Sequence, residues 1–274
     1  MQIVLSNYAN AYYLKSQQQN IDSGLDVGGF TKVFSYSPED LSQFIQKNNS
    51  EILRCYRGNG YWLWKPYLIC KSLKLLNEGD VLVYSDAGII FLSSVHPLIE
   101  LLLKSKQDLL VFDTKRLEAQ MTKRDAFILM DCDESSFSSS KQRMGGFIVI
   151  RSSKFSKAFF KEFLQLAQDP RILTDIPNRC GEQNYEIFVD HRHDQSILSL
   201  LSKKYELESF RDPSQYGNSV KCEYGNSPYN QIIELTRKSS ETRIERAMGK
   251  LWNRFCLFQI ERRLNASEEV SIDL

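Results

Sequence analysis

The clearest pattern of apolar and polar positions lies in residues 66–84, where a helical periodicity gives way to a strand. Three apolar residues recur at spacings of four and three, as on one face of a helix: Ile69, Leu73 and Leu76. Pro66 suits the first helical position, where its missing N–H costs nothing, and Gly79 suits a left-handed cap at the helix end. Residues 81–84 are apolar, β-branched or aromatic, which is typical of a strand buried on both faces.

Similar patterns predict further elements. Short apolar runs indicate strands at residues 2–5, 32–36, 109–112 and 147–150. A capping serine, a proline and two acids predict a helix start at Ser37. Further helices are predicted at residues 153–168, which carry an aromatic face, and at residues 197–205. The chain of 274 residues is long enough for one large α/β domain with or without an appendage.

The last periodic stretch, residues 239–264, predicts a helix with an apolar face and basic flanks. Its apolar residues alternate at spacings of four and three: Ile244, Met248, Leu251, Phe255 and Phe258. Its basic residues are Arg243, Arg246, Lys250, Arg254, Arg262 and Arg263. Such a helix is expected either to pack on the main domain or to rest on an anionic membrane surface or a partner.

Composition narrows the class of protein. The formal net charge of +1 argues against a chain-wide attraction to nucleic acid, so no nucleic-acid partner is expected. The first residues show no secretory signal, and no apolar run approaches the length of a membrane span. The six cysteines are scattered without a CxxC pair, which favours reduced thiols and a cytoplasmic setting.

The end of the strand at residues 81–84 carries the first candidate site: Ser85, Asp86, Ala87 and Gly88. Ligands of open α/β sheets bind at the carboxyl ends of strands, and a single acid beside small residues points to a metal ion or a diphosphate. A basic and aromatic loop precedes the strand, with Arg57, Trp64 and Lys65. Ser6 and Asn7 follow the first predicted strand, where they are expected either to touch a base or ribose or to act in a turn or cap.

Two later stretches are rich in chemistry. Arg143 and the pair Gly145–Gly146 precede an apolar strand, and the glycines either let the backbone approach a ligand or form a tight bend. A polar cluster then starts a helix: His191, Arg192, His193, Asp194 and Gln195. Asp194 is expected either to cap that helix or to join a site. Residues 169–190 are irregular, and we interpret them as a lid.

Several standard motifs are missing from the sequence. It has no G-x-S-x-G nucleophile elbow, no P-loop and no G-x-G-x-x-G fingerprint after the first strand, which also disfavours a Rossmann-like methyltransferase. The remaining carboxylates, histidines and cations suit a site for a metal-bound diphosphate leaving group.

The run KPYLICKSLKLLNEGDVLVYSDAG resembles the nucleotide-sugar-binding half of GT-A glycosyltransferases, in which a basic loop and a helix precede a strand ending in an Asp-x-Asp motif. Bacterial lipopolysaccharide and capsule glycosyltransferases share a Gly-Tyr-Trp-x-Trp-Lys-Pro segment and a His-Asp-Gln element, here residues 60–66 and 193–195. The resemblance implies a GT-A (Rossmann-like) α/β domain at residues 1–210, with a mixed, mostly parallel sheet flanked by helices. Residues 211–274 are expected to form a C-terminal extension with an amphipathic basic helix.

The resemblance also implies roles for the residues around Asp86. Asp86 matches the first acid of the Asp-x-Asp motif, which binds Mn2+ or Mg2+ together with the donor diphosphate, whereas Gly88 replaces the second acid. Three alternatives follow: Asp86 holds the metal through water, His191 or His193 completes the metal shell, or the enzyme needs no metal. In the last case a cation neutralises the leaving phosphate, for which the candidates are Arg57, Lys65 and Arg143.

Catalytic roles follow from the same resemblance. Gly145 and Gly146 lie where such enzymes pass their backbone beside the donor sugar, and Asp194 and Gln195 match an acid-amide pair that faces the reacting sugar. Asp194 is the first choice for the general base, or for orienting the donor if configuration is retained, and Glu182 is the second choice for the base. Trp64 is expected either to stack on the base or an acceptor sugar ring or to lie in the core.

We therefore expect a cytoplasmic transferase, peripheral at the inner membrane, that moves a sugar from a nucleotide-diphosphate donor, with UDP favoured. The acceptor would be an oligosaccharide or lipid-linked glycan of lipopolysaccharide O-antigen or capsule. The alternative is a catalytically inactive nucleotide- or carbohydrate-binding protein of the same fold, which the missing second acid at Gly88 supports. Convergence of Asp86 and Asp194 on one pocket is the central expectation.

Overall fold

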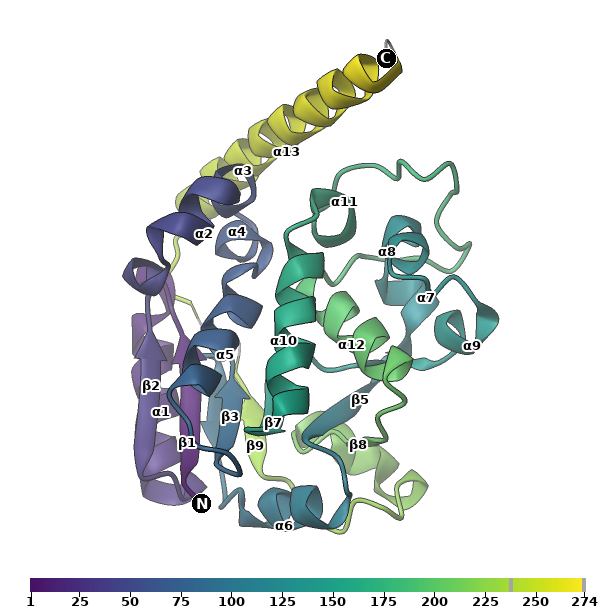
Figure 1. The fold of residues 1–274 in the computed structure, drawn as a ribbon. Coiled ribbons are helices and arrows are strands. Elements are labelled where there is room, and N and C mark those ends of the chain that lie inside the picture. Colours follow the sequence, from purple (N-terminus) through teal and green to yellow (C-terminus); the bar gives the residue numbers. More distant parts are fainter. Residues whose placement is uncertain (237–238, 273–274) are drawn as a thin grey trace.

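The computed structural model describes residues 1–236 and 239–272, and a mixed sheet of seven strands forms its centre (Figure 1). The strands are β1 (Ile3–Tyr8), β2 (Lys32–Tyr36), β3 (Val81–Ser85), β5 (Leu109–Leu117), β6 (Lys141–Arg143), β7 (Phe147–Arg151) and β8 (Ser209–Arg211). Their order is β2-β1-β3-β7-β5-β6, and β8 also pairs with β5. A second, two-stranded sheet joins β4 (Ile89–Phe91) to β9 (Ile233–Leu235).

The strand directions confirm the expected mixed, mostly parallel sheet. β1 pairs in parallel with β2 and β3, and β8 pairs in parallel with β5. β7 lies antiparallel between β3 and β5, and β6 is antiparallel to β5. β1, β2, β3, β5 and β8 therefore share one direction. Because β1 and β3 are parallel neighbours, their carboxyl ends lie at the same edge of the sheet.

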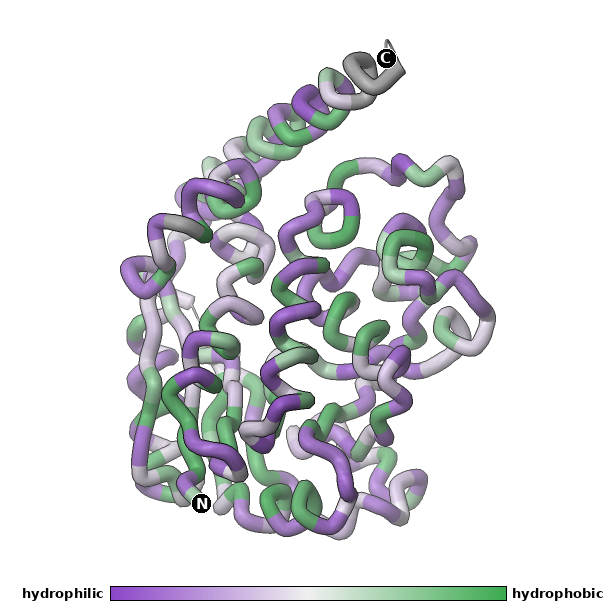
Figure 2. The backbone as a smooth tube through the Cα atoms, viewed as in Figure 1, coloured by the Kyte–Doolittle hydropathy of each residue, from purple (hydrophilic) through white to green (hydrophobic). Residues whose placement is uncertain are grey.

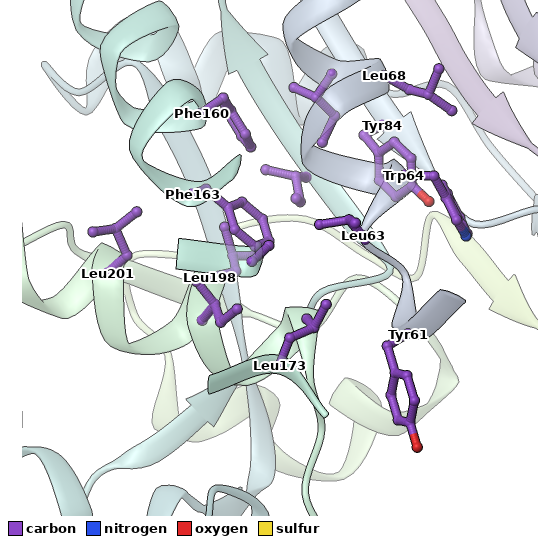
Figure 3. Close-up of a cluster of buried hydrophobic side chains, with 14 of the residues drawn as sticks. Tyr61, Leu63, Trp64, Leu68, Tyr84, Phe160, Phe163, Leu173, Leu198 and Leu201 are labelled. Atoms are coloured by element: carbon purple, nitrogen blue, oxygen red, sulfur yellow. The ribbon is translucent and has the colours of Figure 1, made fainter. Parts of the chain in front are cut away.

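Helices and the small sheet cover both faces of the main sheet. On one face α5 (Trp64–Lys74) packs on β1 and β3, α10 (Lys154–Ala167) packs on α5 and on α12 (Asp194–Lys204), and α12 also contacts β6. Figure 3 shows part of this core. On the other face lie α6 (His96–Lys104) and the β4–β9 pair. Alternate residues of β3 point into the two cores, which confirms that this strand is buried on both faces.

The other helices place the loops around this body. They are η1 (Ala11–Tyr13), α1 (Leu14–Ser23), η2 (Gly24–Gly28), η3 (Pro38–Asp40), α2 (Gln43–Asn48), α3 (Ser50–Leu53), α4 (Gly58–Tyr61), α7 (Glu118–Met121), α8 (Arg124–Leu129), α9 (Ser135–Ser138), α11 (Pro170–Leu173) and η4 (Gln215–Glu223). The long helix α13 (Arg243–Ile272) extends away from the sheet (Figure 1). The predicted helix at residues 153–168 is α10, with Ser153 as its N-cap.

Some predicted boundaries are wrong. β1 continues through Ser6 and Asn7, which were expected in a loop, because both side chains find buried hydrogen-bond partners. α5 begins at Trp64 and ends at Lys74, so Pro66 is its third residue and Gly79 is not its cap. Gly79 has φ +85° in the turn before β3, where a left-handed residue is still needed.

The α/β body ends later in the chain than residue 210, where the C-terminal extension was expected to begin. The boundary at residue 210 falls inside β8, and β9 pairs with β4, so the chain up to residue 236 belongs to the α/β body. α13 packs on that body through Asn253, Cys256 and Ile260, which are almost fully buried. Its predicted apolar face stays exposed, and Figure 2 shows hydrophobic and hydrophilic segments alternating along the helix.

Candidate active site

A buried ammonium group joins the two carboxylates that were expected to share a pocket. Lys65, in the first turn of α5, places Nζ 2.6 Å from Asp194 Oδ2 and 3.3 Å from Asp86 Oδ1. The same ammonium donates to the carbonyl oxygen of Gly145 over 3.0 Å. Its side chain is 3% exposed. Burial lowers the pKa of Lys65, but attraction by Asp194 and Asp86 outweighs that effect and raises it, so Lys65 is a permanent cation.

Asp86 is the exposed member of the site. It follows β3 directly, and its side chain is 39% exposed, whereas that of Asp194 is 6% exposed. Tyr84 donates its hydroxyl to Asp86 Oδ1 over 2.7 Å, and the Asp86 N–H donates to the carbonyl of Gly146 over 2.8 Å. Burial, followed by the charge of Asp86, raises the pKa of Tyr84 well above its ordinary value, so Tyr84 remains a donor. Asp86 is therefore a carboxylate that its neighbours hold in place and that stays partly open to solvent.

Asp194 is the buried member of the site. It is the first residue of α12, and burial raises the pKa of its carboxyl to about 6, although Lys65 pulls the value down. The preceding residue, His193, has φ +53°, a strained conformation for a residue other than glycine. The ring of His193 is fixed by a 2.8 Å bond to the Leu173 carbonyl and by stacking on Trp62. These contacts hold the turn that directs Asp194 toward Lys65.

The glycine pair leaves no room for side chains beside these carboxylates. A Cβ on Gly146 would lie 2.8 Å from Asp86 Oδ2, and one on Gly145 would lie 2.8 Å from the Cβ of Gln195. The N–H of Gly145 donates to Gln195 Oε1 over 3.0 Å, and Gln195 donates to Gln142 Oε1 over 2.7 Å. The glycines were expected either to let the backbone approach a ligand or to form a tight bend, and what the structure shows is close contact of this backbone with Asp86 and Gln195. Gln195 therefore fixes the position of the glycine loop.

His191 and His193 do not complete a metal shell with Asp86. His191 accepts from the Lys123 N–H and donates to the Ile172 carbonyl, so both ring nitrogens are occupied. His193 Nε2 lies 3.8 Å from Asp175 Oδ1, and the side chains that contact the Asp86 carboxylate are those of Lys65 and Tyr84. Burial lowers the pKa of both rings well below its ordinary value, and they are neutral packing residues.

In the described part of the chain, the contacts of Asp86 include no further His, Cys, Asp or Glu side chain that could share a divalent metal ion with it. Among the side chains that the structure describes, no three His, Cys, Asp or Glu residues are placed to hold a metal ion. The space between Asp86 and Asp194 is occupied by the Lys65 ammonium, which already supplies positive charge to both carboxylates. Of the three alternatives raised by the missing second acid, these contacts argue against a metal shell completed by His191 or His193, and Lys65 is a cation in contact with Asp86.

Three other charged candidates lie outside this cluster. Arg57 forms ion pairs with Asp175 and Asp190 at 3.0 and 3.2 Å. Arg143 donates to Ser202 and to the Leu207 carbonyl near the far end of α12. Glu182 is exposed in the loop between α11 and α12, where its carbonyl accepts from Asn178. The roles predicted for Arg57 and Arg143 as phosphate ligands and for Glu182 as a base find no support in these contacts.

The candidates at the ends of β1 and β3 form a buried polar network. Ser6 bonds to Ser72, Asn7 donates to Asn20, and Asn20 donates to Ser85. Their side chains are therefore committed inside the protein, which argues against the predicted contacts of Ser6, Asn7 and Ser85 with a nucleotide. Two small residues follow the end of β3. Ala87 is buried, and the carbonyl oxygen of Gly88 accepts a hydrogen bond from the N–H of Thr236.

Trp64 belongs to the core. It is 5% exposed, stacks on Tyr8 with 3.8 Å between ring centroids, and donates Nε1 to the Gly58 carbonyl. Of the two roles expected for Trp64, the structure therefore supports packing. Trp62, which is partly buried, stacks on His193 and is likewise engaged within the protein.

The sequence interpretation missed Tyr84 and Gln142. Tyr84 lies two residues before Asp86, and side chains at alternate strand positions share a face, so its contact with Asp86 was open to prediction. Gln142 reaches the site through Gln195, which lies 53 positions away. A contact over that separation leaves no periodic signal in a single sequence.

No family model matches the sequence, and no curated protein matches it. The solved structures that this chain is similar to include glycosyltransferases. The galactosyltransferase LgtC in complex with donor and acceptor sugar analogues has a TM-score of 0.48 and 12% identity over 93% of this chain and 95% of that chain. Mouse xyloside xylosyltransferase 1 has a TM-score of 0.47 and 9% identity, covering 86% and 97%. Streptococcus pneumoniae GlyE has a TM-score of 0.46 and 13% identity, covering 96% and 64%. These similarities concern the fold, so the chemistry has to be argued from the residues of the site.

Proposed function

We propose that this protein is a GT-A-type glycosyltransferase that moves a sugar from a nucleotide-diphosphate donor, with UDP favoured, to a hydroxyl of a surface glycan of the lipopolysaccharide or capsule class. One observation carries the proposal: Asp86, Lys65 and Asp194 meet at the carboxyl end of β3. An exposed carboxylate can bind sugar hydroxyls, a buried cation can favour negative charge on a leaving group, and a buried carboxylate with a raised pKa can act as a base in glycosyl transfer from a diphosphate.

Each group has a chemical role in this proposal. The exposed Asp86 accepts hydrogen bonds from sugar hydroxyls. The N–H groups of Lys65 are already used by Asp86, Asp194 and Gly145, so its charge acts through space to favour the negative charge that develops on the leaving diphosphate. The bond between the sugar carbon and the phosphate oxygen breaks, and a bond from that carbon to the acceptor oxygen forms. In an inverting transfer Asp194 accepts the proton of the acceptor hydroxyl, and in a retaining transfer it orients the donor.

The rival function is nucleotide or carbohydrate binding without turnover. Gly88 in place of a second acid favours it, because a strictly metal-dependent relative would be inactive with one ligand. Slow hydrolysis separates the two: an enzyme releases nucleotide from one sugar nucleotide in a panel of UDP- and GDP-sugars. Saturable binding without release over the whole panel would favour the rival.

The first prediction concerns metal. UDP or GDP is expected to raise the melting temperature equally in EDTA and in Mn2+, because Lys65 already provides the cation at Asp86. At about 100 times the dissociation constant, a ligand stabilises the folded state by roughly 2.7 kcal/mol. Differential scanning fluorimetry measures this shift. A shift that requires Mn2+ would contradict the role of Lys65, and no shift with either nucleotide would contradict nucleotide binding altogether.

We further propose that α13 attaches the protein to the cytoplasmic face of an anionic membrane. Five apolar residues on this helix are 50–73% exposed: Ile244, Met248, Leu251, Phe255 and Phe258. Residues 243–267 contain six basic residues beside this apolar stripe but only two acidic ones, Glu245 and Glu261. No helix among the described residues is long and apolar enough to cross a membrane. An exposed apolar stripe with basic flanks fits the interface of an anionic bilayer.

The second prediction tests this attachment. The double substitution Met248→Asp and Leu251→Asp is expected to abolish co-flotation with vesicles that contain anionic lipid, because charge would enter the apolar stripe. Leu75→Asp is the matched control, since Leu75 is 61% exposed outside α13. The spacing of the stripe also suits a coiled-coil seam, so sedimentation is measured in parallel. A stable dimer that does not float with vesicles would contradict membrane attachment.

A further inference from the structure

A pocket lies near the far end of α12, away from the Asp86 site. It has a volume of about 400 Å³ and is lined by residues from β5, α9, β6, α12 and β8: Asp113, Ser136, Phe137, Ser140, Lys141, Arg143, Lys203 and Ser209. Asp194 starts α12, and Lys203 lies nine residues later, about 13 Å along the helix axis. The pocket is therefore distinct from the cluster of Asp86, Lys65 and Asp194.

Arg143 is the cation of this pocket that lacks a counter-ion. Lys203 pairs with Glu118 at 2.8 Å, and Lys141 pairs with Glu223 at 2.9 Å. Arg143 is 7% exposed, and over the described part of the chain no carboxylate lies within ion-pair distance of it. Its guanidinium donates to the Ser202 hydroxyl and the Leu207 carbonyl, whereas its Nε has no partner among the described residues.

The acid in the pocket does not neutralise Arg143 directly. Asp113 Oδ2 accepts hydrogen bonds from Ser209 and Tyr224 at 2.8 and 2.9 Å. Burial lowers the pKa of Arg143 to about 10, with partial compensation from Asp113 and Glu118, so the guanidinium stays charged at neutral pH. A buried charge without a partner is costly, and an anion that formed charge-assisted hydrogen bonds would relieve that cost.

We infer that this pocket binds a small anion bearing several hydroxyl groups, such as a sugar acid or a sugar phosphate. Arg143 pairs with the anionic group, with Lys203 and Lys141 beside it. The hydroxyl oxygens of Ser136, Ser140 and Ser209 accept from ligand hydroxyls, and Phe137 offers an apolar ring. This inference is independent of the reaction proposed for the Asp86 site, because none of the lining residues belongs to that site.

The test measures binding of glucuronate and glucose 1-phosphate by titration calorimetry, with glucose and inorganic phosphate as comparison ligands. The titrations contain no nucleotide, because UDP is itself an anion with hydroxyl groups and would compete for this pocket. We expect at least one anionic sugar to bind more tightly than glucose and phosphate. Arg143→Gln is expected to weaken that binding at least tenfold, which is the effect of losing one charge-assisted hydrogen bond.

Two further variants keep the test conclusive if Arg143→Gln does not fold. Lys141→Gln removes a cation that is 40% exposed, and it is expected to weaken binding about threefold. Lys115→Gln removes an exposed cation on β5 that lies outside the pocket lining, and it is expected to leave binding unchanged. The inference is overturned if neither anionic sugar binds, if phosphate alone binds as tightly, or if Lys115→Gln weakens binding as much as Lys141→Gln.

Discussion

Replacing Lys65 by methionine is expected to abolish most donor binding and turnover. Methionine keeps much of the side-chain volume but removes the ammonium that contacts Asp86, Asp194 and Gly145. Loss of one preorganised donor at a developing charge costs about 10²–10³-fold in rate. Calorimetry with UDP and release of nucleotide from the sugar-nucleotide panel measure the two effects. Unchanged nucleotide affinity in the variant would contradict the assignment.

The same substitution is expected to destabilise the fold, because it leaves Asp194 buried without a partner. Removing one member of a buried pair costs about 3–5 kcal/mol. Without Lys65 the pKa of Asp194 in the folded state rises further. At a pH between that value and the lower pKa of the unfolded chain, the folded protein holds a proton on Asp194 that the unfolded chain does not hold. The loss of stability should therefore shrink as pH falls through that raised pKa. The double variant Lys65→Met, Asp194→Asn should recover part of the stability.

Lys71→Met is the matched control for this experiment. Lys71 lies on the same helix and pairs with Asp40 at 2.8 Å, but its side chain is 36% exposed. A pair that is partly open to solvent contributes up to about 1 kcal/mol, so this variant should fold, bind nucleotide and turn over like the unmutated protein. An equal loss in both variants would show that the helix, and not the Lys65 cation, governs the site.

Replacing Asp194 by asparagine is expected to stop turnover while nucleotide binding survives. Asparagine preserves the shape of the side chain at the start of α12 but cannot accept the acceptor proton, and positioned acid–base groups contribute about 10²–10⁴-fold. Nucleotide release with acceptor and calorimetry with UDP separate the two steps. Full activity in this variant would remove Asp194 from the mechanism.

The pH profile and a matched carboxylate sharpen this test. Because the pKa of Asp194 is about 6 and the base must be ionised, kcat/KM of the unmutated protein should fall tenfold per pH unit below about 6. An acid limb near pH 4 would indicate a more exposed carboxylate. Asp212→Asn is the control, since Asp212 is also buried with a raised pKa but bonds to Ser214 outside the site. That variant should keep its activity.

Local signals identified much of the fold. The apolar periodicity, together with prolines, glycines and capping residues, located β3, α5 and α10. It also predicted that Asp86 follows the end of a strand that is buried on both faces. These elements could be predicted because helix and strand patterns depend on residues that are close in the sequence. The position of Asp86 could be predicted because the carboxyl ends of parallel strands lie at one edge of a sheet, where ligands bind. Errors concentrated at element ends, as at Asn7 and Gly79, where distant partners decide how far a strand or helix extends.

What the chain by itself determined was the set of reactive residues and the strand edge that carries Asp86. Only the tertiary structure decided which of them meet. Lys65 pairs with Asp194 across 129 positions, Arg143 turns to a separate pocket, and His191 binds backbone carbonyl and amide groups. The physical reason is that a buried charge takes whichever counter-ion packing brings within about 4 Å, and long-range packing leaves no periodic trace in one sequence.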